Sequence, residues 1–427
     1  MESKRFLFMM GEGGGNVPPQ LGLARALVSR GHKVRVLTEP ILEEDVLAAG
    51  ASYVSFTKGP HRTDRSREYD IVRDFDAKTP LGALAAYRNR VIFGPARAYA
   101  EDTMAEIERW RPHVVAPDWI RTGAAIASEA AGIPTALLVH GLNFLPEPGK
   151  PPPGFGFLPS GSIAGRVRDF VFGRGFVRLL NKGLPALNDA RRAFGLEPLS
   201  HVVNHFERPE RFLCLYSEAF DLPADQRFRN LRYVGPVLEE PAWAEPWTSP
   251  WPTNDRRPLV VIAMSTTFMK QESTLMRCIE AVSEMPVRAL VTLGPALDPA
   301  DFPAPGNVVV VQSAPHDAVF QQTDAVITHA GMGTVSRALA NGLPLVCMPM
   351  GRDQDDIAAR VRWHGAGVSM RASSSAAKIR AALKRVLSDR SFRAAAEQLR
   401  DAIQSDLAGG HAVAELEALA DLAGSRS

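Results

Sequence analysis

Apolar positions in the first third of the chain change repeatedly between the spacing of a buried strand and that of an amphipathic helix. Short apolar runs predict strands, and longer stretches with an apolar residue every third or fourth position predict helices. The expected elements are strands at 5–10, 33–38, 113–116 and 135–139 and helices from Pro19 to Gly31 and at 122–131. Strands that alternate with helices indicate a doubly wound parallel sheet.

A second block after residue 258 repeats the same alternation. Its expected elements are strands at 259–264, 287–292, 307–311, 324–329 and 344–348 and helices at 272–283, at 316–322 and from Thr334 to Gly342. The pattern therefore predicts an α/β protein with two Rossmann-like domains, each built on a doubly wound parallel sheet. Open sheets of this kind bind ligands at the carboxyl ends of their strands, so a site is expected in the cleft where the domains face each other.

Proline and tryptophan are concentrated between the two blocks. Five prolines and three tryptophans fall within 241–258, a composition that resists regular structure and is typical of a semi-rigid linker. We therefore expect four regions, namely an N-terminal domain, a linker, a C-terminal domain and a terminal helix, at 1–238, 239–258, 259–408 and 409–427.

The segment from Phe144 to Pro185 follows neither period and combines aromatic residues with glycines and arginines. We interpret it as an apolar and partly mobile wall. Aromatic faces give a large contact area at low entropic cost, so this wall could receive a flat, hydrophobic ligand. The alternative, that the aromatic side chains merely pack the loop onto the core, is equally compatible with the sequence.

Composition narrows the function further. A length of 427 residues suits two domains, and a formal net charge of +2 implies no nucleic-acid partner. The three cysteines lie far apart, which argues against a disulfide framework or a metal cluster. No run of eighteen apolar residues and no signal-type segment is present. We expect a cytoplasmic protein that does not insert stably into a membrane.

The stretch from Ile327 to Gln354 contains the clearest candidate site. His329, Gly331, Gly333 and Thr334 stand where a strand is expected to give way to a helix. Glycines let backbone N–H groups approach an anion, and a helix start adds roughly half a positive charge. Thr334 could donate a hydroxyl and His329 a ring N–H, so this turn could hold a diphosphate without a metal.

Two polar side chains follow the next expected strand. Asp353 and Gln354 lie at its carboxyl end, where a carboxylate and an amide suit neighbouring sugar hydroxyls. Two other interpretations remain: a structural strand-to-helix turn with a capping histidine, and a metal-binding D-x-D element spelled by Asp353 and Asp355. The second is disfavoured because the helix start already serves the phosphate.

The pattern H-x-G-x-G-T, then G-x-P, then D-Q resembles the donor-binding signature of the GT-B glycosyltransferases that modify small molecules. This group includes the UDP-glucuronosyl, plant natural-product and macrolide transferases, and the resemblance covers most of the chain. It implies that the turn at His329 holds the diphosphate and that Asp353 and Gln354 hold sugar hydroxyls. It also implies an acceptor site in the N-terminal domain and a terminal helix that returns to that domain.

The resemblance extends to other donor contacts, with two departures. Ser265 and Thr266 match a turn that touches phosphate in the family. Ser313, Ala314 and His316 occupy the place of the W-x-P-Q element, and Ser313 replaces the tryptophan that stacks on the base, so base recognition would fall to groups near Ala314 and to His316. Arg337 stands where many relatives carry a ribose-binding glutamate. The loss of that acceptor leaves UDP-glucose and a dTDP-hexose as equal alternatives.

A third departure concerns catalysis. Attack by an acceptor hydroxyl needs a general base, and the family usually supplies a histidine in a G-H-x-x-P loop, oriented by an aspartate. The matching loop has Asn16, which has no basic nitrogen. Asp118 matches the orienting aspartate, and it is the favoured candidate to take the proton itself. His140, at the end of the next expected strand, is the second candidate, although Asp118 could simply cap a helix and His140 could be a core residue.

Two other functions deserve comparison. Gly11, Gly13 and Asn16 after a strand, with Glu39 after the next, partly imitate a dinucleotide fingerprint, but the third glycine is missing and the second domain would be unexplained. Asn16 also raises the alternative of a degenerate homologue that binds and activates a partner enzyme.

The sequence is therefore best explained by an inverting hexosyltransferase that needs no metal or other cofactor. Its partners would be a nucleotide-sugar donor and a hydrophobic small-molecule acceptor, such as a phenolic or polyketide natural product, and the chain would act as a monomer or homodimer. The acceptor, the sugar and the linkage stay open.

Overall fold

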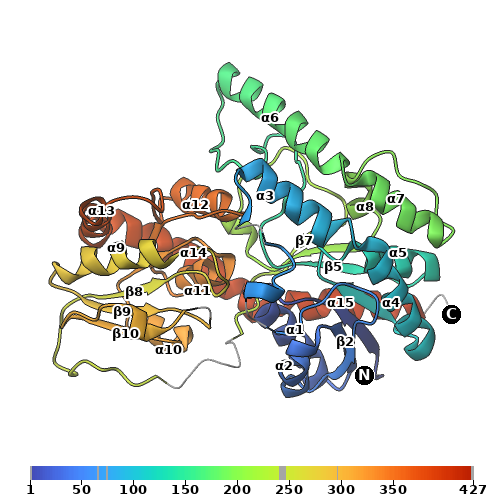
Figure 1. Cartoon of the computed structure of the whole chain (residues 1–427), viewed down its shortest axis with the longest axis horizontal. Coiled ribbons are helices and arrows are strands. Elements are labelled where there is room, and N and C mark those ends of the chain that lie inside the picture. The colour runs from blue at the N-terminus through green and yellow to red at the C-terminus, as the bar shows by residue number, and fades with distance from the viewer. Residues whose placement is uncertain (1, 65–66, 74–75, 240–246, 296, 425–427) are drawn as a thin grey trace.

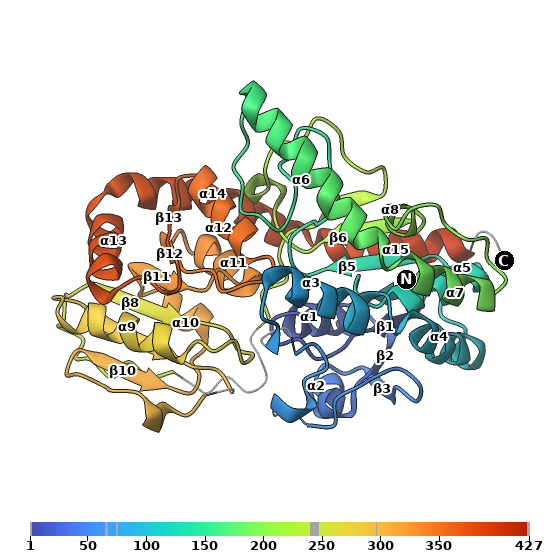
Figure 2. The same ribbon diagram turned by 45° about the horizontal axis from the view of Figure 1, so that its top comes forward.

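The chain forms two α/β domains that lie side by side (Figure 1). The computed structural model describes residues 2–64, 67–73, 76–239, 247–295 and 297–424. Figure 2 shows the same two units after a turn about the horizontal axis, with helices on both faces of the sheet in each. The cleft between them faces the ends of both sheets, so the arrangement of the strands decides which loops meet there.

The first domain contains a four-stranded and a three-stranded parallel sheet. Their strands are β1 (Arg5–Met9), β2 (Lys33–Thr38), β3 (Ser52–Ser55), β4 (Val114–Pro117), β5 (Ala136–Val139), β6 (Arg211–Cys214) and β7 (Leu231–Tyr233). The orders are β3-β2-β1-β4 and β5-β6-β7, and two parallel bridges join β4 to the start and end of β5. Strands β2 and β3 are added on one side of β1 and β4 on the other, so the topological switch point lies between β1 and β4.

The second domain has one six-stranded parallel sheet. Its strands are β8 (Leu259–Ala263), β9 (Arg288–Thr292), β10 (Val308–Val311), β11 (Ala325–Thr328), β12 (Leu345–Cys347) and β13 (Gly367–Ser369). The order β10-β9-β8-β11-β12-β13 places the switch point between β8 and β11. The prediction of two doubly wound parallel sheets is confirmed, and each switch point opens a crevice at the carboxyl ends of two strands.

Helices cover both faces of each sheet. Those of the first domain are α1 (Val17–Ser29), α2 (Glu43–Ala48), α3 (Pro80–Tyr87), α4 (Ala96–Trp110), α5 (Thr122–Ala131), α6 (Ile163–Asn181), α7 (Leu184–Ala193) and α8 (Val203–Glu207). The later ones are α9 (Glu272–Ser283), α10 (His316–Phe320), α11 (Met332–Ala340), α12 (Gln354–Trp363), α13 (Ala376–Ser388), α14 (Arg390–Gly409) and α15 (His411–Gly424). Short 3₁₀ turns occur at 40–42, 67–69, 218–220 and 299–301, and a π-helical turn follows α3 at 88–92.

Two helices begin earlier than the sequence predicts. Helix α1 starts at Val17, because Pro18 and Pro19 fit its first turn, where no backbone donor is required. Helix α11 starts at Met332 and not at Thr334. Ala330 takes a left-handed φ of 67°, which makes the turn after β11 so tight that the helix begins two residues sooner.

The prediction of an irregular wall at Phe144–Pro185 is wrong for its second half. Helix α6 spans 19 residues there, and its N-cap is Ser162, whose hydroxyl accepts a hydrogen bond from the Gly165 N–H. Aromatic and aliphatic residues at helical spacing outweigh Gly173 and Gly175, which lower helix propensity by about 1 kcal/mol each. Within the described part of the chain, no helix is long and apolar enough to cross a membrane.

Helix α15 contacts α1 and β4 of the first domain, and Figure 1 labels it there. Glu417 accepts hydrogen bonds from Arg30 at 2.7 and 3.0 Å and lies 2.9 Å from the His32 ring. The division of the chain at residues 238, 258 and 408 stays a prediction. Part of its expected linker, 240–246, lies outside the described residues.

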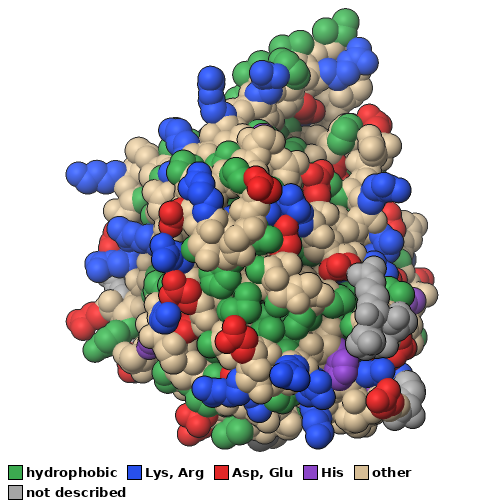
Figure 3. Space-filling model, turned by 90° about the vertical axis from the view of Figure 1, so that its right-hand side faces the viewer, with side chains coloured by type: hydrophobic (Ala, Val, Ile, Leu, Met, Phe, Trp, Pro, Cys, Tyr) green, Lys and Arg blue, Asp and Glu red, His purple; other side chains and the backbone are tan. Residues whose placement is uncertain are grey.

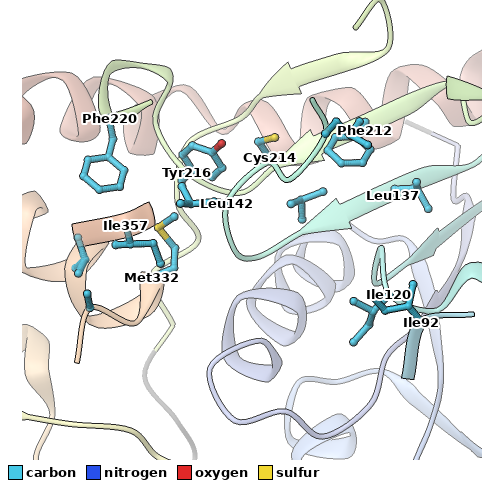
Figure 4. Packing of buried hydrophobic residues seen from close by; sticks show 14 of the residues in the cluster. Ile92, Ile120, Leu137, Leu142, Phe212, Cys214, Tyr216, Phe220, Met332 and Ile357 are labelled. Atoms are coloured by element: carbon cyan, nitrogen blue, oxygen red, sulfur yellow. The ribbon is translucent and has the colours of Figure 1, made fainter. Parts of the chain in front are cut away.

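Apolar packing continues from one domain into the other. One cluster of buried residues contains Leu142, Tyr216 and Phe220 of the first domain together with Met332 and Ile357 of the second. Figure 4 shows Met332 and Ile357 next to Leu142 and Tyr216. Since apolar surface is removed from water here, the contact favours one relative placement of the two sheets.

Candidate active site

A cleft of about 1810 Å³ lies between the domains. Its lining includes the glycine loop at 11–15 after β1, His140 after β5, and the turns after β8, β11 and β12. Typical sites for one small ligand measure roughly 300–1,000 Å³, so this cleft has room for two substrates side by side. Strands of both domains point their carboxyl ends into it.

The turn between β11 and α11 forms one wall of the cleft. Gly331 is the N-cap of α11 in extended conformation, and a Cβ there would lie 2.5 Å from His329 Nε2. A side chain at Gly331 would therefore displace the histidine. A Cβ at Gly333 would meet nothing within 4 Å, and Thr334 is half-buried. The structure thus brings His329, Gly331, Gly333 and Thr334 together around the start of one helix, with Gly333 open to the cleft.

The His329 ring is 9% exposed and hydrogen-bonds the backbone of Ala263 at the end of β8. Burial lowers its pKa to about 4, although the hydrogen bond to Ala263 opposes this shift. A neutral imidazole carries one N–H. The Thr328 hydroxyl lies 3.5 Å from Nδ1, whereas Nε2 lies on the side of the ring that faces Gly331 and the start of α11.

The residues after β8 face the glycine loop of the first domain. Ser265 Oγ lies 3.1 Å from the hydroxyl of Thr267 and accepts the Thr267 N–H at 3.2 Å. A Cβ at Gly14 would lie 2.6 Å from Thr266 Oγ1. Gly14 also has a φ of +78°, so both its conformation and this close approach require glycine.

Asp353 and Gln354 lie at the start of α12, Asp353 as its N-cap. The Gln354 amide oxygen accepts the Met350 N–H at 2.8 Å, whereas its nitrogen contacts the sulfur of Met269 at 3.4 Å. Sulfur is a weak acceptor, so a sugar hydroxyl could replace it. Asp353 Oδ2 accepts the Leu142 N–H of the first domain at 3.4 Å.

The expected base-binding residues lie beside the same cleft. His316 stacks on Phe320 with ring centroids 4.9 Å apart, and its Nε2 is 3.3 Å from the Thr292 hydroxyl. Burial lowers the pKa of His316 to about 4. Ser313 and Ala314 are both buried.

Arg337 is 6% exposed and reaches out of α11 to two oxygens. Its Nε donates to Asp317 Oδ1 at 2.9 Å, and its Nη2 donates to the Glu239 carbonyl at 2.8 Å. The guanidinium therefore joins the second domain to residue 239, the last residue of the described range 76–239. Arg337 occupies the position in α11 where the family resemblance implies a ribose-binding glutamate, so no carboxylate is present at that position.

The three candidate catalytic residues are close together. Asp118 is fully buried, and its Oδ2 accepts the Asn16 amide and the Gln20 amide at 3.0 Å each. His140 Nδ1 is 3.5 Å from the same oxygen. That nitrogen is buried without a hydrogen-bond partner among the described residues, yet the His140 side chain is 21% exposed. The exposed part of the imidazole therefore lies on its other side, and His140 lines the cleft.

Sequence reasoning missed several residues of this cleft. Gln20 could have been found, because it lies one helical turn after Asn16 on the same face of α1. Tyr87 lines the cleft at the end of α3, and burial raises its pKa, with further influence from Asp118 and Asp353. Trp119 and Phe144 stack with centroids 4.0 Å apart and form part of the apolar wall. Such contacts are not encoded by local spacing.

Helix α12 is fastened to the first domain at two further points. Asp356, 7% exposed, accepts the backbone N–H groups of Gly154 and of Gly156, the latter at 2.8 Å. Arg360 lies 2.7 Å from Asp221 Oδ1, and Lys150 lies 2.7 Å from Asp221 Oδ2. Burial would raise the pKa of Asp221, but Arg360 and Lys150 hold it well below its usual range.

A metal centre has no obvious ligands in the described ranges, where no group of three or more His, Cys, Asp or Glu side chains is suitably placed. Asp353 and Asp355 of the D-x-D alternative belong to no such group.

Comparison with known proteins identifies the family. A model described as Erythromycin biosynthesis protein CIII-like, C-terminal domain, matches residues 277–419. 4′-Demethylrebeccamycin synthase of Lentzea aerocolonigenes is 30% identical over 409 residues, which cover 93% of this chain and 95% of that protein. The chain belongs to the family of natural-product glycosyltransferases, enzymes that transfer a sugar to small-molecule acceptors.

Solved structures agree on the fold. The calicheamicin glycosyltransferase CalG4 matches with a TM-score of 0.75 and 23% identity, covering 98% of each chain. The glycosyltransferase VinC in complex with dTDP matches with a TM-score of 0.64 and 20% identity, covering 99% of this chain and 100% of that one. The GT-B fold expected from the sequence is confirmed.

The contacts of Asp356 lead to a first prediction. Replacing Asp356 by Ala removes the acceptor of two backbone N–H groups, so the amides of Gly154 and Gly156 should exchange with solvent about tenfold faster or more. Hydrogen–deuterium exchange of the peptide that covers 150–158 measures this. Asp355→Ala, one residue earlier on α12, is the control and should leave the exchange unchanged. Equal exchange in both variants would contradict a fastening role for Asp356.

Proposed function

We propose that this chain transfers a hexose, with inversion, from a nucleotide sugar to a large hydrophobic acceptor, and that the reaction needs no metal. The observation that carries the proposal is the shared cleft. The helix start at Gly331 and the pair Asp353 and Gln354 line it from the second domain, whereas Trp119 and Phe144 line it from the first. A charged donor and an apolar acceptor could therefore meet at the midline of the cleft.

The second domain would bind the donor. Backbone N–H groups at the start of α11 and the Thr334 hydroxyl suit the diphosphate, because a helix N-terminus favours anions. Ser265 and Thr266 would approach the same phosphates from β8, and Ser313, Ala314 and His316 would surround the base. Asp353 and Gln354 would hold sugar hydroxyls. The diphosphate charge that develops as the bond breaks would be stabilised by these fixed dipoles, without a cation.

We further propose that His140, and not Asp118, is the general base. Asp118 is fully buried, and its Oδ2 already accepts two amides, so an acceptor hydroxyl has no access to it. His140 reaches the cleft and turns Nδ1 toward Asp118. A carboxylate beside Nδ1 favours the tautomer whose Nε2 can accept a proton. Asn16 and Gln20 would then act as positioning residues that hold Asp118.

The reaction then balances with no further reagent. The acceptor oxygen or nitrogen attacks the anomeric carbon as its proton moves to His140 Nε2, and the bond from that carbon to the diphosphate oxygen breaks. The nucleoside diphosphate leaves on the opposite face of the sugar, so the anomeric configuration inverts. A base in reach of the attacking proton typically contributes about 10²–10⁴ in rate.

Among donors, we expect a dTDP-hexose to be used better than UDP-glucose. Arg337 offers only hydrogen-bond donors and is engaged with Asp317 and Glu239, so it supplies no acceptor to the second hydroxyl of ribose. The dTDP bound to VinC is consistent with such a preference in this fold.

A screen of the purified protein tests the function directly. We expect mass spectrometry to detect a hexosylated product from dTDP- or UDP-hexoses with a panel of phenolic and polyketide acceptors, and EDTA to leave the rate unchanged. Asp353→Asn should abolish most turnover, because an amide cannot accept as many hydroxyl hydrogen bonds as a carboxylate. If no donor and acceptor pair reacted, the chain would instead be a binding or activating partner of another enzyme. Loss of activity with EDTA would refute metal independence.

The choice of base is tested by two substitutions. His140→Ala should lower kcat at least about 100-fold and leave donor affinity unchanged. Asp118→Asn should lower kcat less, and the ionisation seen in the pH–rate profile should persist, because the imidazole remains. A near-normal rate for His140→Ala with a severe loss for Asp118→Asn would show that Asp118 takes the proton itself.

Donor binding should depend on pH through His329. In the protein without a donor, the pKa of the His329 ring is about 4. A neighbouring diphosphate favours the charged form of the ring, so the protein should take up a proton when the donor binds. Affinity should therefore rise as the pH falls from 8 towards 5, by at most about tenfold per pH unit. Calorimetry with an intact nucleotide sugar, whose charge is constant in this range, measures the effect. His329→Gln should remove it, and a pH-independent wild type would exclude proton uptake.

A further inference from the structure

Helix α6 projects from the first domain with an unusual outward face. Figures 1 and 2 show it extending from the body of the protein at its N-terminal end. Three large apolar side chains on the outward side of this helix are more than half exposed, namely Ile163 at 74%, Val167 at 56% and Phe170 at 63%, whereas Val171, at 57%, lines the cleft. Most large apolar side chains of this chain are buried, so a row of this kind requires an explanation.

The polar residues of this helix are mostly basic. Helix α6 contains four arginines and one aspartate, so its local net charge of +3 exceeds the +2 of the whole chain. Arg166, Arg174 and Arg178 are exposed, and Arg174 lies over the Phe170 ring at 5.4 Å. Asp169 is partly buried and paired with Arg168. At helical spacing, the exposed arginines and the apolar row share the outward side of the helix.

Figure 3 shows hydrophobic and basic side chains next to one another on the projection at the top of the molecule. An exposed apolar row with arginines on the same side of a projecting helix offers an anionic lipid surface both apolar contact and positive charge. The apolar side chains enter the boundary of the acyl chains, whereas each arginine extends its charge to the lipid head groups.

We propose that the outward face of α6, defined by Ile163, Val167, Phe170, Arg166, Arg174 and Arg178, docks this protein reversibly on an anionic lipid surface. Anionic head groups attract each nearby basic residue, and buried apolar area adds to this attraction. A second copy of the chain fits this face less well, because a two-fold contact would place arginines against arginines.

The opposite side of α6 belongs to the cleft. Phe172, Gly175, Phe176, Leu179 and Leu180 line the apolar wall of the cavity. If the proposed function holds, a hydrophobic acceptor dissolved in the lipid would enter the cleft along this helix. The docking itself does not require that function, and it is measured without turnover.

Flotation of the full-length protein with lipid vesicles tests the proposal. At low salt, we expect the protein to float with vesicles that contain phosphatidylglycerol and to remain in the soluble fraction when the vesicles contain only phosphatidylcholine. Salt at about 0.5 M should release the protein from the anionic vesicles, because ions at that concentration screen charges beyond a few ångströms. Failure to float with anionic vesicles at low salt would overturn the proposal.

Two variants locate the surface. Ile163→Gln with Val167→Gln and Phe170→Gln removes the apolar row, and Arg166→Gln with Arg174→Gln and Arg178→Gln removes the charges. Glutamine is a good helix former, so circular dichroism should be unchanged. Each triple variant should lower the bound fraction about tenfold or more. None of the six residues lines the cleft.

Matched controls carry equal changes elsewhere. Leu47, Met276 and Leu422 are exposed apolar residues on other helices, and Arg97, Arg109 and Arg208 are exposed arginines. Their triple glutamine variants should bind vesicles like the wild type, and an equal loss in these controls would contradict a specific surface. Light scattering gives a separate readout. A dimer that the apolar α6 variant dissociates would identify the face as an interface between copies and overturn the lipid proposal.

Discussion

The attachment of α12 to the first domain is the constraint on which the arrangement of the cleft depends. Asp356 accepts two backbone N–H groups of the loop at 154–156, and Arg360 pairs with the buried Asp221. Charges removed from water are stable only when partners compensate them, so neither contact tolerates a change of register. Because Asp353 and Gln354 begin the same helix, the sugar-binding candidates are fixed relative to the wall that faces them.

A second buried carboxylate organises the opposite side of the cleft. Asp118 has no contact with solvent, and the amides of Asn16 and Gln20 satisfy one of its oxygens. Asn16 therefore donates a hydrogen bond to Asp118 but supplies no basic nitrogen. In the described part of the chain, the imidazole placed beside that carboxylate is that of His140, which directly follows β5.

The fold could be predicted from sequence to the extent that local periodicity determines it. Helices α5 and α9 and strand β2 have the expected bounds, since each combines a regular apolar pattern with a clear stop signal. Helix α6 could not be predicted in this way. Its outward face is apolar where a surface helix is normally polar, and its glycines imitate a loop.

The candidate site, like the fold, could be predicted from the sequence only in part. Motif spacing was sufficient for the turn at His329 and for Asp353 and Gln354, because one strand, one helix and the next strand bring these residues together. The lowered pKa of His329 could not be foreseen, since it results from burial by segments far away in sequence, such as the end of β8. The same holds for His140, whose ranking against Asp118 depends on burial. Sequence patterns therefore indicate which groups are present, whereas their protonation and access depend on contacts between distant segments.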